Sequence, residues 1–94
     1  MEIKQIEHGS KGAFLIVEGS ERLGEMTYSK AGDHMIIIDH TEVSDKLRGQ
    51  SAGKKLVLQA VEYARKNNIK ILPLCPFAKA TFDRTPEIQD VLSR

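Results

Sequence analysis

A short glycine-containing segment and a lone cysteine are the parts of this sequence best suited to chemistry. The segment, RGQSAGKK, runs from Arg48 to Lys55, and its middle fits G-x-S-x-G, the pattern that presents a catalytic serine in hydrolases. The same residues also read as a glycine-containing turn that opens a helix, where unpaired backbone N–H groups can hold a phosphate. The two interpretations predict different functions, ester hydrolysis or the binding of a phosphorylated cofactor.

The order of the histidines argues against a hydrolase. In hydrolases with this serine elbow, an acid and then a histidine follow the serine along the chain. Here His8, His34 and His40 all precede Ser51, and no histidine follows it. A chain of 94 residues is also too short for a complete hydrolase sheet. The hydrolase interpretation is therefore rejected.

The phosphate interpretation depends on the kind of loop. A Walker A loop is excluded because three residues rather than four separate Gly49 from Gly53, and because a second lysine follows Lys54. A strand-to-helix turn still suits an anion, since the helix start offers unpaired N–H groups and the positive end of a dipole. Arg48 and Lys54 add positive charge. The alternative, left open here, is that the glycines only make a tight corner.

Cys75 is expected to be the N-cap of a helix, because the proline after it favours the first helical position. A thiolate at a helix N-terminus is stabilised by the dipole and the amides, so its pKa falls. His40 is expected to end the neighbouring strand, close enough to accept the thiol proton. An inert buried cysteine and a structural or solvent-facing histidine are the alternatives.

The elements that must position these residues follow from hydrophobic spacing. Strands are predicted at residues 3–7, 13–18, 22–29 and 34–43, with a bulge at Gly24, and the short turns between them indicate an antiparallel meander. A helix is predicted at 51–67 and a strand at 69–74, which implies parallel pairing through a right-handed crossover. A short helix at 76–84 and a capped helix start at Thr85 complete an α+β, or α/β mixed, sheet in one domain, residues 1–94.

Composition limits the partners and the setting. A formal charge of +1 gives no support for a nucleic-acid partner. The lone cysteine allows no intramolecular disulfide and favours a reducing, cytoplasmic setting. No N-terminal apolar segment indicates a signal peptide or a membrane span. No metal site is expected, because His40 and Glu42 share a strand face but lack a third ligand at usable spacing.

Two sets of motifs resemble the GNAT superfamily of N-acetyltransferases. Residues 43–57, VSDKLRGQSAGKKLV, are similar to its acetyl-coenzyme A signature, Gln/Arg-x-x-Gly-x-Gly/Ala, placed between a central strand and the long helix. Arg48 fits the first position and Gly53 the last, whereas Ser51 stands where glycine is usual. His40-Thr41 and Cys75-Pro76 resemble hallmark pieces of the small single-domain members of the superfamily.

The resemblance implies the GNAT fold and an acetyl-coenzyme A-dependent N-acetyltransferase, with Cys75 and His40 as the catalytic residues. It also implies that the cofactor lies along two backbone segments. These comprise Asp39, His40, Thr41, Glu42 and Val43, beside the thioester, and Arg48, Gly49, Gln50, Ser51, Ala52, Gly53 and Lys54, at the diphosphate.

The resemblance leaves the mechanism and the acceptor open. An acetyl-Cys75 intermediate could form with His40 as the base. Alternatively, the amine attacks the thioester directly, while His40, Glu42 or water takes its proton and Cys75 protonates the departing thiolate. Full GNAT domains usually carry helices between their first two strands, whereas HGSKG alone joins those strands here. The resemblance therefore implies an open thioester end, which favours a protein or peptide amine as acceptor. A catalytically weak coenzyme A-binding or interaction module is the alternative function.

Overall fold

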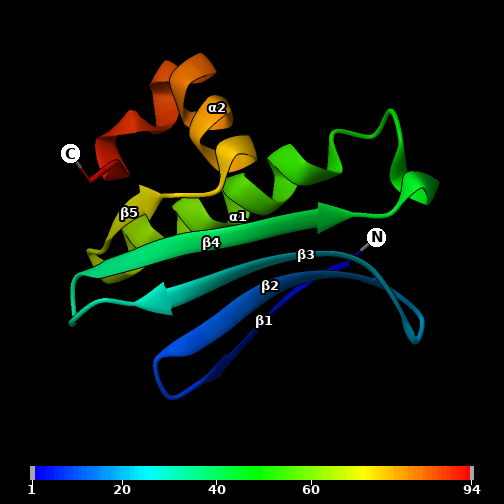
Figure 1. Cartoon of the computed structure of the whole chain (residues 1–94), viewed down its shortest axis with the longest axis horizontal. Helices are drawn as coiled ribbons and strands as arrows, with labels where there is room; N and C mark the ends of the chain where they lie inside the picture. The colour runs from blue at the N-terminus through cyan, green and yellow to red at the C-terminus, as the bar shows by residue number, and fades with distance from the viewer. Residues whose placement is uncertain (1, 94) are drawn as a thin grey trace.

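The computed structural model describes residues 2–93 as a five-stranded sheet with helices on one side (Figure 1). The strands are β1 (Glu2–His8), β2 (Lys11–Glu18), β3 (Glu21–Lys30), β4 (Met35–Val43) and β5 (Lys70–Pro73). They lie side by side in chain order, with antiparallel pairing from β1 to β4 and parallel pairing between β4 and β5. The predicted mixed sheet is confirmed.

Two α-helices and two short 3-10 helices complete the described chain. The α-helices are α1 (Ala52–Asn67) and α2 (Pro76–Arg84), and the 3-10 helices are η1 (Asp45–Leu47) and η2 (Pro86–Val91). α1 ends where the sequence predicts, because Asn68 takes a left-handed conformation with a φ of 56°. The helix start predicted at Thr85 is a 3-10 helix rather than an α-helix.

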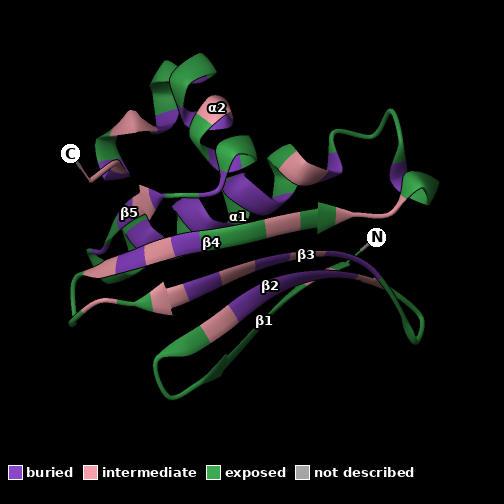
Figure 2. Cartoon of the chain, in the orientation of Figure 1, coloured by how far each residue is buried: buried purple, intermediate pink, exposed green. Residues whose placement is uncertain are grey.

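The hydrophobic core lies between the sheet and α1. The helix buries six residues that recur at helical spacing, Ala52, Leu56, Val57, Ala60, Val61 and Ala64. Facing them are buried side chains from one face of the sheet, among them Phe14, Ile16, Met26, Tyr28, Ile36 and Ile38. Figure 2 shows this buried layer, while much of the second half of β4 is exposed. The packing of α1 on the sheet therefore fixes both ends of the loop that joins β4 to α1.

The bulge predicted in β3 lies one residue from its expected position. Ile16 pairs with Gly24 and Val17 with Arg22, so Leu23 is the extra residue. Gly24 has a different role: a Cβ there would lie 2.9 Å from Cδ1 of Ile16. It is a glycine because the Ile16 side chain occupies the space where a side chain would be.

Candidate functional site

β4 and β5 separate halfway along β4. Their pairing runs from Met35 opposite Lys70 to Ile38 opposite Pro73. The N–H groups of Leu74 and Cys75 both donate to the carbonyl of Ile38, each at 3.1 Å. Beyond this point β4 continues to Val43, whereas β5 ends and the segment after it turns into α2 (Figure 1). The two strands therefore leave an opening between them, bordered by the predicted site residues of β4 and by Cys75.

A bulge at Asp39 decides which side chains of β4 face which side. Tyr28 pairs with Ile38 and Thr27 with His40, so Asp39 is the extra residue, and its carboxylate accepts a hydrogen bond from Ser29 at 3.0 Å. Side chains alternate along a strand, but an extra residue reverses the alternation. Uninterrupted alternation from Ile38 would turn His40 toward the helices, whereas the bulge turns Thr41 toward them instead.

The register of the sheet confirms this reversal. Thr41 lies opposite Met26, which lies opposite Phe14, and both of these side chains are in the core beneath α1. His40 lies opposite Thr27 and so belongs to the face without helices. The strand ends carrying His40 and Cys75 do come together as expected, but the two side chains belong to opposite faces of the sheet.

The thiol of Cys75 lies at the opening on the helix side. Cys75 is the N-cap of α2 and is only 5% exposed, and its Sγ donates to Thr41 Oγ1 at 3.4 Å. Burial alone would raise the pKa of this thiol, but Thr41 and the backbone N–H groups of Ala78 and Phe77 outweigh burial and lower it. The Cys75 side chain makes no capping hydrogen bond to α2, so the N–H groups of Phe77 and Ala78 lower the thiol pKa because they lie close to Sγ. The site is therefore built to stabilise a thiolate.

His40 and Glu42 form the polar group on the opposite face. His40 Nε2 lies 3.6 Å from Glu42 Oε2, which confirms that the two side chains share a strand face. The His40 side chain is 60% exposed. An exposed imidazole beside a carboxylate can accept a proton from a group arriving from solvent.

Part of the β4 backbone is available at the opening. The N–H of Ser44 donates to the carbonyl of Leu23 in β3 at 2.8 Å. Because backbone groups alternate in direction along a strand, the N–H and C=O groups of Thr41 and Val43 point away from β3, toward the opening. An extended ligand lying there would find the edge of a strand to pair with.

The loop before α1 combines engaged and unengaged N–H groups. The N–H of Arg48 donates to the carbonyl of Asp45 and that of Gln50 to the carbonyl of Leu47, each at 3.1 Å. The first helical bond joins the N–H of Lys55 to the carbonyl of Ser51 at 3.0 Å. Within residues 2–93, no acceptor is recorded for the other five N–H groups of the segment, those of Gly49, Ser51, Ala52, Gly53 and Lys54.

Two residues of this loop have left-handed backbone. Gly49 has a φ of 82° and Ser51 a φ of 54°. Glycine adopts this conformation without steric penalty, whereas serine does not. The glycine that is usual at the position of Ser51 thus has a conformational reason, and the serine in this chain carries strain at the helix start.

Phe77 is a site neighbour that sequence reasoning missed. A Cβ on Gly53 would lie 2.5 Å from Cζ of Phe77, so the ring covers the start of α1. The ring is nevertheless 41% exposed. The sequence held no local signal for this role, because the contact joins α2 to the start of α1, two segments far apart in the chain.

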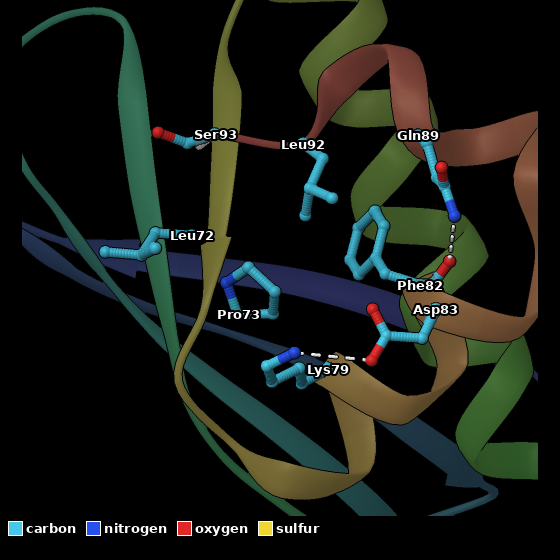
Figure 3. A pocket seen from close by; sticks show the side chains of 8 residues that line it. All are labelled: Leu72, Pro73, Lys79, Phe82, Asp83, Gln89, Leu92 and Ser93. Carbon is cyan, nitrogen blue, oxygen red and sulfur yellow. Dashed lines mark hydrogen bonds and ion pairs between the residues drawn. The ribbon is translucent and has the colours of Figure 1, made fainter.

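A separate hollow of about 390 Å³ lies on the outer edge of β5 (Figure 3). Its lysine and its aspartate are already paired, with Lys79 Nζ 3.3 Å from Asp83 Oδ2. Gln89 Nε2 donates to the carbonyl of Phe82 at 2.9 Å. None of the predicted site residues lines this hollow, so it does not belong to the opening between β4 and β5.

Two further features bear on the class of site. From residue 2 to residue 93, no three His, Cys, Asp or Glu side chains gather closely enough to hold a metal ion. The helices of that same stretch are too short or too polar to cross a membrane.

The chain matches known proteins at two levels. Residues 13–91 match the family model of the GCN5-related N-acetyl-transferases. The solution structure of a GCN5-like protein from Staphylococcus aureus has 45% sequence identity and a TM-score of 0.77, over 98% of this chain and 87% of that one. No curated protein matches the chain.

Larger acetyltransferases share the fold over part of their length. A Bacillus subtilis acetyltransferase in complex with CoA has 26% identity and a TM-score of 0.57, over 69% of this chain and 43% of its own. Tetrahymena GCN5 has 15% identity and a TM-score of 0.66, over 90% of this chain and 61% of its own. The chain thus spans about half the length of these larger proteins.

Proposed function

Because this chain belongs to the GCN5-related N-acetyltransferase family, we propose that it transfers the acetyl group of acetyl-coenzyme A to an amine. The observation that carries the proposal is the set of five unengaged N–H groups at the start of α1. They can hold a diphosphate, and the unpaired edge of β4 leads from them to Cys75. The residues present therefore fit the cosubstrate.

The arrangement of the faces favours direct transfer over an acetyl-cysteine intermediate. A base for Cys75 would have to reach the thiol, but His40 lies on the other face of the sheet. In direct transfer the amine nitrogen bonds to the thioester carbon and the carbon–sulfur bond breaks. His40 takes the proton of the amine on the open face, and Cys75 gives its proton to the leaving thiolate on the helix side. Each residue then acts where its strand places it.

The acceptor in this proposal is a protein or peptide amine. No helix covers the face that carries His40 and Glu42, and both side chains are exposed (Figure 2). An amine on a large molecule can approach such a face, whereas a small molecule would gain little from it. We place the reaction in the cytoplasm, without nucleic acid, because the thiol of Cys75 must remain reduced and the formal charge is only +1.

Two measurements on the intact protein test this function. The first is a thermal-shift titration with coenzyme A, which should raise the melting temperature because ligand binds the folded state. The second is mass spectrometry after incubation with acetyl-coenzyme A, with and without a lysine-containing peptide. We expect an acetylated peptide and no acetylated Cys75.

Each alternative gives a different result. Binding without transfer to any amine would identify a coenzyme A-binding module. Accumulation of acetyl-Cys75 that disappears when the peptide is added would establish the covalent route. Absence of any thermal shift would overturn the proposal.

A further inference from the structure

The two edges of the sheet differ in how they are protected. At one edge, β5 has only four residues and ends at Pro73, which has no N–H to offer a neighbouring strand. The outer side of β5 is also occupied. Leu92 forms a parallel bridge with Ile71, and the N–H of Ser93 donates to the Ile71 carbonyl at 2.8 Å. These features keep another chain from pairing with this edge.

The opposite edge, formed by β1, has no such protection (Figure 1). Within residues 2–93, no strand pairs with the outer side of β1. The strand has seven residues, contains no proline and pairs with β2 without a register shift, so no bulge interrupts it. It also carries Ile6, which is 48% exposed. A long, regular edge strand is a template on which another strand can pair.

The hairpin between β1 and β2 decides which backbone groups of β1 point outward. A two-residue turn joins the strands, so His8 and Lys11 exchange both of their backbone hydrogen bonds. The direction of the backbone groups then alternates along the strand. The N–H and C=O groups that point outward are therefore those of Ile3, Gln5 and Glu7.

A second copy of β1 fits this edge best in one antiparallel register. Outward-pointing residues must lie opposite outward-pointing residues, which leaves few choices. With Gln5 opposite its own copy, the whole strand is paired and Ile3 lies opposite Glu7. A shift of two residues in one direction would place Lys4 opposite its own copy, where like charges repel. The opposite shift would centre the pair on Ile6 and leave the start of each strand unpaired.

The side chains are complementary in the register centred on Gln5. On the face without helices, Lys4 lies opposite Ile6, and the methylene groups of the lysine can cover the exposed isoleucine while its ammonium group stays in water. On the same face Glu2 lies opposite His8, an acid facing a base. The symmetry of the pair provides each of these contacts twice.

A hollow of about 830 Å³ lies next to β1 on the helix side of the sheet. Gln5 lines it from β1, and Gln59, Tyr63 and Lys66 are among the residues that line it from α1. Gln5 is also the centre of the register described above. The hollow therefore has room for the side chains that a second strand would place on this face.

We propose that β1 pairs with β1 of a second copy, antiparallel and centred on Gln5, so that two copies form a symmetric dimer with one continuous sheet. Three facing residue pairs would exchange about six backbone hydrogen bonds. One pair of strands is a small interface, so the dimer is reversible and depends on concentration. The strand order places β4 and β5 at the far edge of each copy, which leaves both candidate sites open.

Sedimentation velocity over a series of concentrations tests the inference. The wild-type chain should change from monomer to dimer below about 1 mM. Ile6→Lys brings a second ammonium group opposite Lys4 at both symmetric places and should weaken the dimer about tenfold or more. Because Ile6 is half exposed, we expect the variant to fold, and a melting curve checks this.

A charge exchange tests the register. Adding Lys4→Glu to Ile6→Lys places opposite charges at the same two contacts, and should restore the association to within about threefold of the wild type. In any other register these two positions do not face each other, so the double variant would remain weak. Leu58→Lys is the matched control, because Leu58 is an exposed apolar residue of α1 that does not line the hollow. It should leave the association unchanged.

Each contrary result has a definite meaning. A wild-type chain that stays monomeric at every concentration would overturn the inference and leave the acetyltransferase proposal standing. A dimer that Ile6→Lys does not weaken, or that Leu58→Lys weakens equally, would overturn it as well, because another surface would then hold the copies together. A double variant that does not recover would overturn the pairing centred on Gln5.

Discussion

The hydroxyl of Thr41 lies 3.4 Å from the thiol of Cys75, across the point where β4 and β5 part. This contact joins the two strands where no backbone ladder remains. It also lowers the pKa of the Cys75 thiol. Without the bulge at Asp39, His40 instead of Thr41 would face the helix side.

Thr41→Val should raise the pKa of Cys75. Valine keeps the shape of the side chain but removes the hydroxyl that can donate to a thiolate, so the charged form loses stabilisation. Ultraviolet absorbance of the thiolate, followed against pH, measures the change. Thr27→Val is the matched control, because Thr27 lies on the opposite face, and its titration should match that of the wild type. An unchanged midpoint in Thr41→Val would contradict this role.

His40→Gln should impair transfer without disturbing Cys75. Loss of a general base typically lowers kcat/KM about a hundredfold. Because the imidazole and the thiol lie on opposite faces, the thiolate titration of the variant should coincide with that of the wild type. A large rise in the thiol pKa would instead indicate direct contact and restore the covalent route.

The bulge at Asp39 marks the limit of what the sequence could predict about the site. The elements, the mixed pairing and the buried face of α1 all follow from local spacing, since each depends on residues near one another in the chain. The run Met35-Ile36-Ile37-Ile38 and the residues after it contain no glycine or proline that would signal an extra residue. The bulge arises from pairing with β3, a relationship between distant segments.

The loop before α1, residues 48–55, was predictable to a greater depth. Its position between strand and helix follows from the change of hydrophobic period, and the glycine signature locates the turn. The sequence could not predict which N–H groups of the loop lack an acceptor, because this depends on η1. The carbonyls of Asp45 and Leu47 in η1 accept from the N–H groups of Arg48 and Gln50. The role of Phe77 was missed for a similar reason, since α2 reaches Gly53 only in the folded chain.

Tyr28 should make the fold sensitive to alkaline pH. Its hydroxyl accepts from Gln5 at 2.7 Å and donates to Glu7 at 3.1 Å, and burial raises its pKa to about 12. A raised pKa means stability that is present below the ordinary value of 10.0 and is lost as the pH rises through about 12. We expect a loss on the order of 2 kcal/mol over that window.

Urea unfolding at a series of alkaline pH values measures this loss. Tyr28→Phe should be less stable at neutral pH, because two hydrogen bonds are removed, but should lose less on going to high pH. Tyr63→Phe is the control, since this ring lies 6.1 Å from Tyr28 in the same aromatic group but not on the Gln5–Glu7 pair. Equal pH dependence in both variants would exclude Tyr28 as the cause.

Ser51→Gly should stabilise the protein and leave the cosubstrate site intact. Ser51 has a φ of 54° and makes no capping hydrogen bond from its side chain, so the hydroxyl brings no local gain for the strain of a left-handed serine. Removing that strain should raise the free energy of unfolding by about 1 kcal/mol, less the added flexibility of glycine in the unfolded chain. Ser51→Ala separates the two effects, because alanine loses the hydroxyl and keeps the strain, and it should give no such gain. Both variants lack the hydroxyl, so a tenfold or greater loss of coenzyme A binding in both would show that the hydroxyl donates to the cosubstrate. The strained serine would then have a role in binding, and the expectation of an intact cosubstrate site would be wrong.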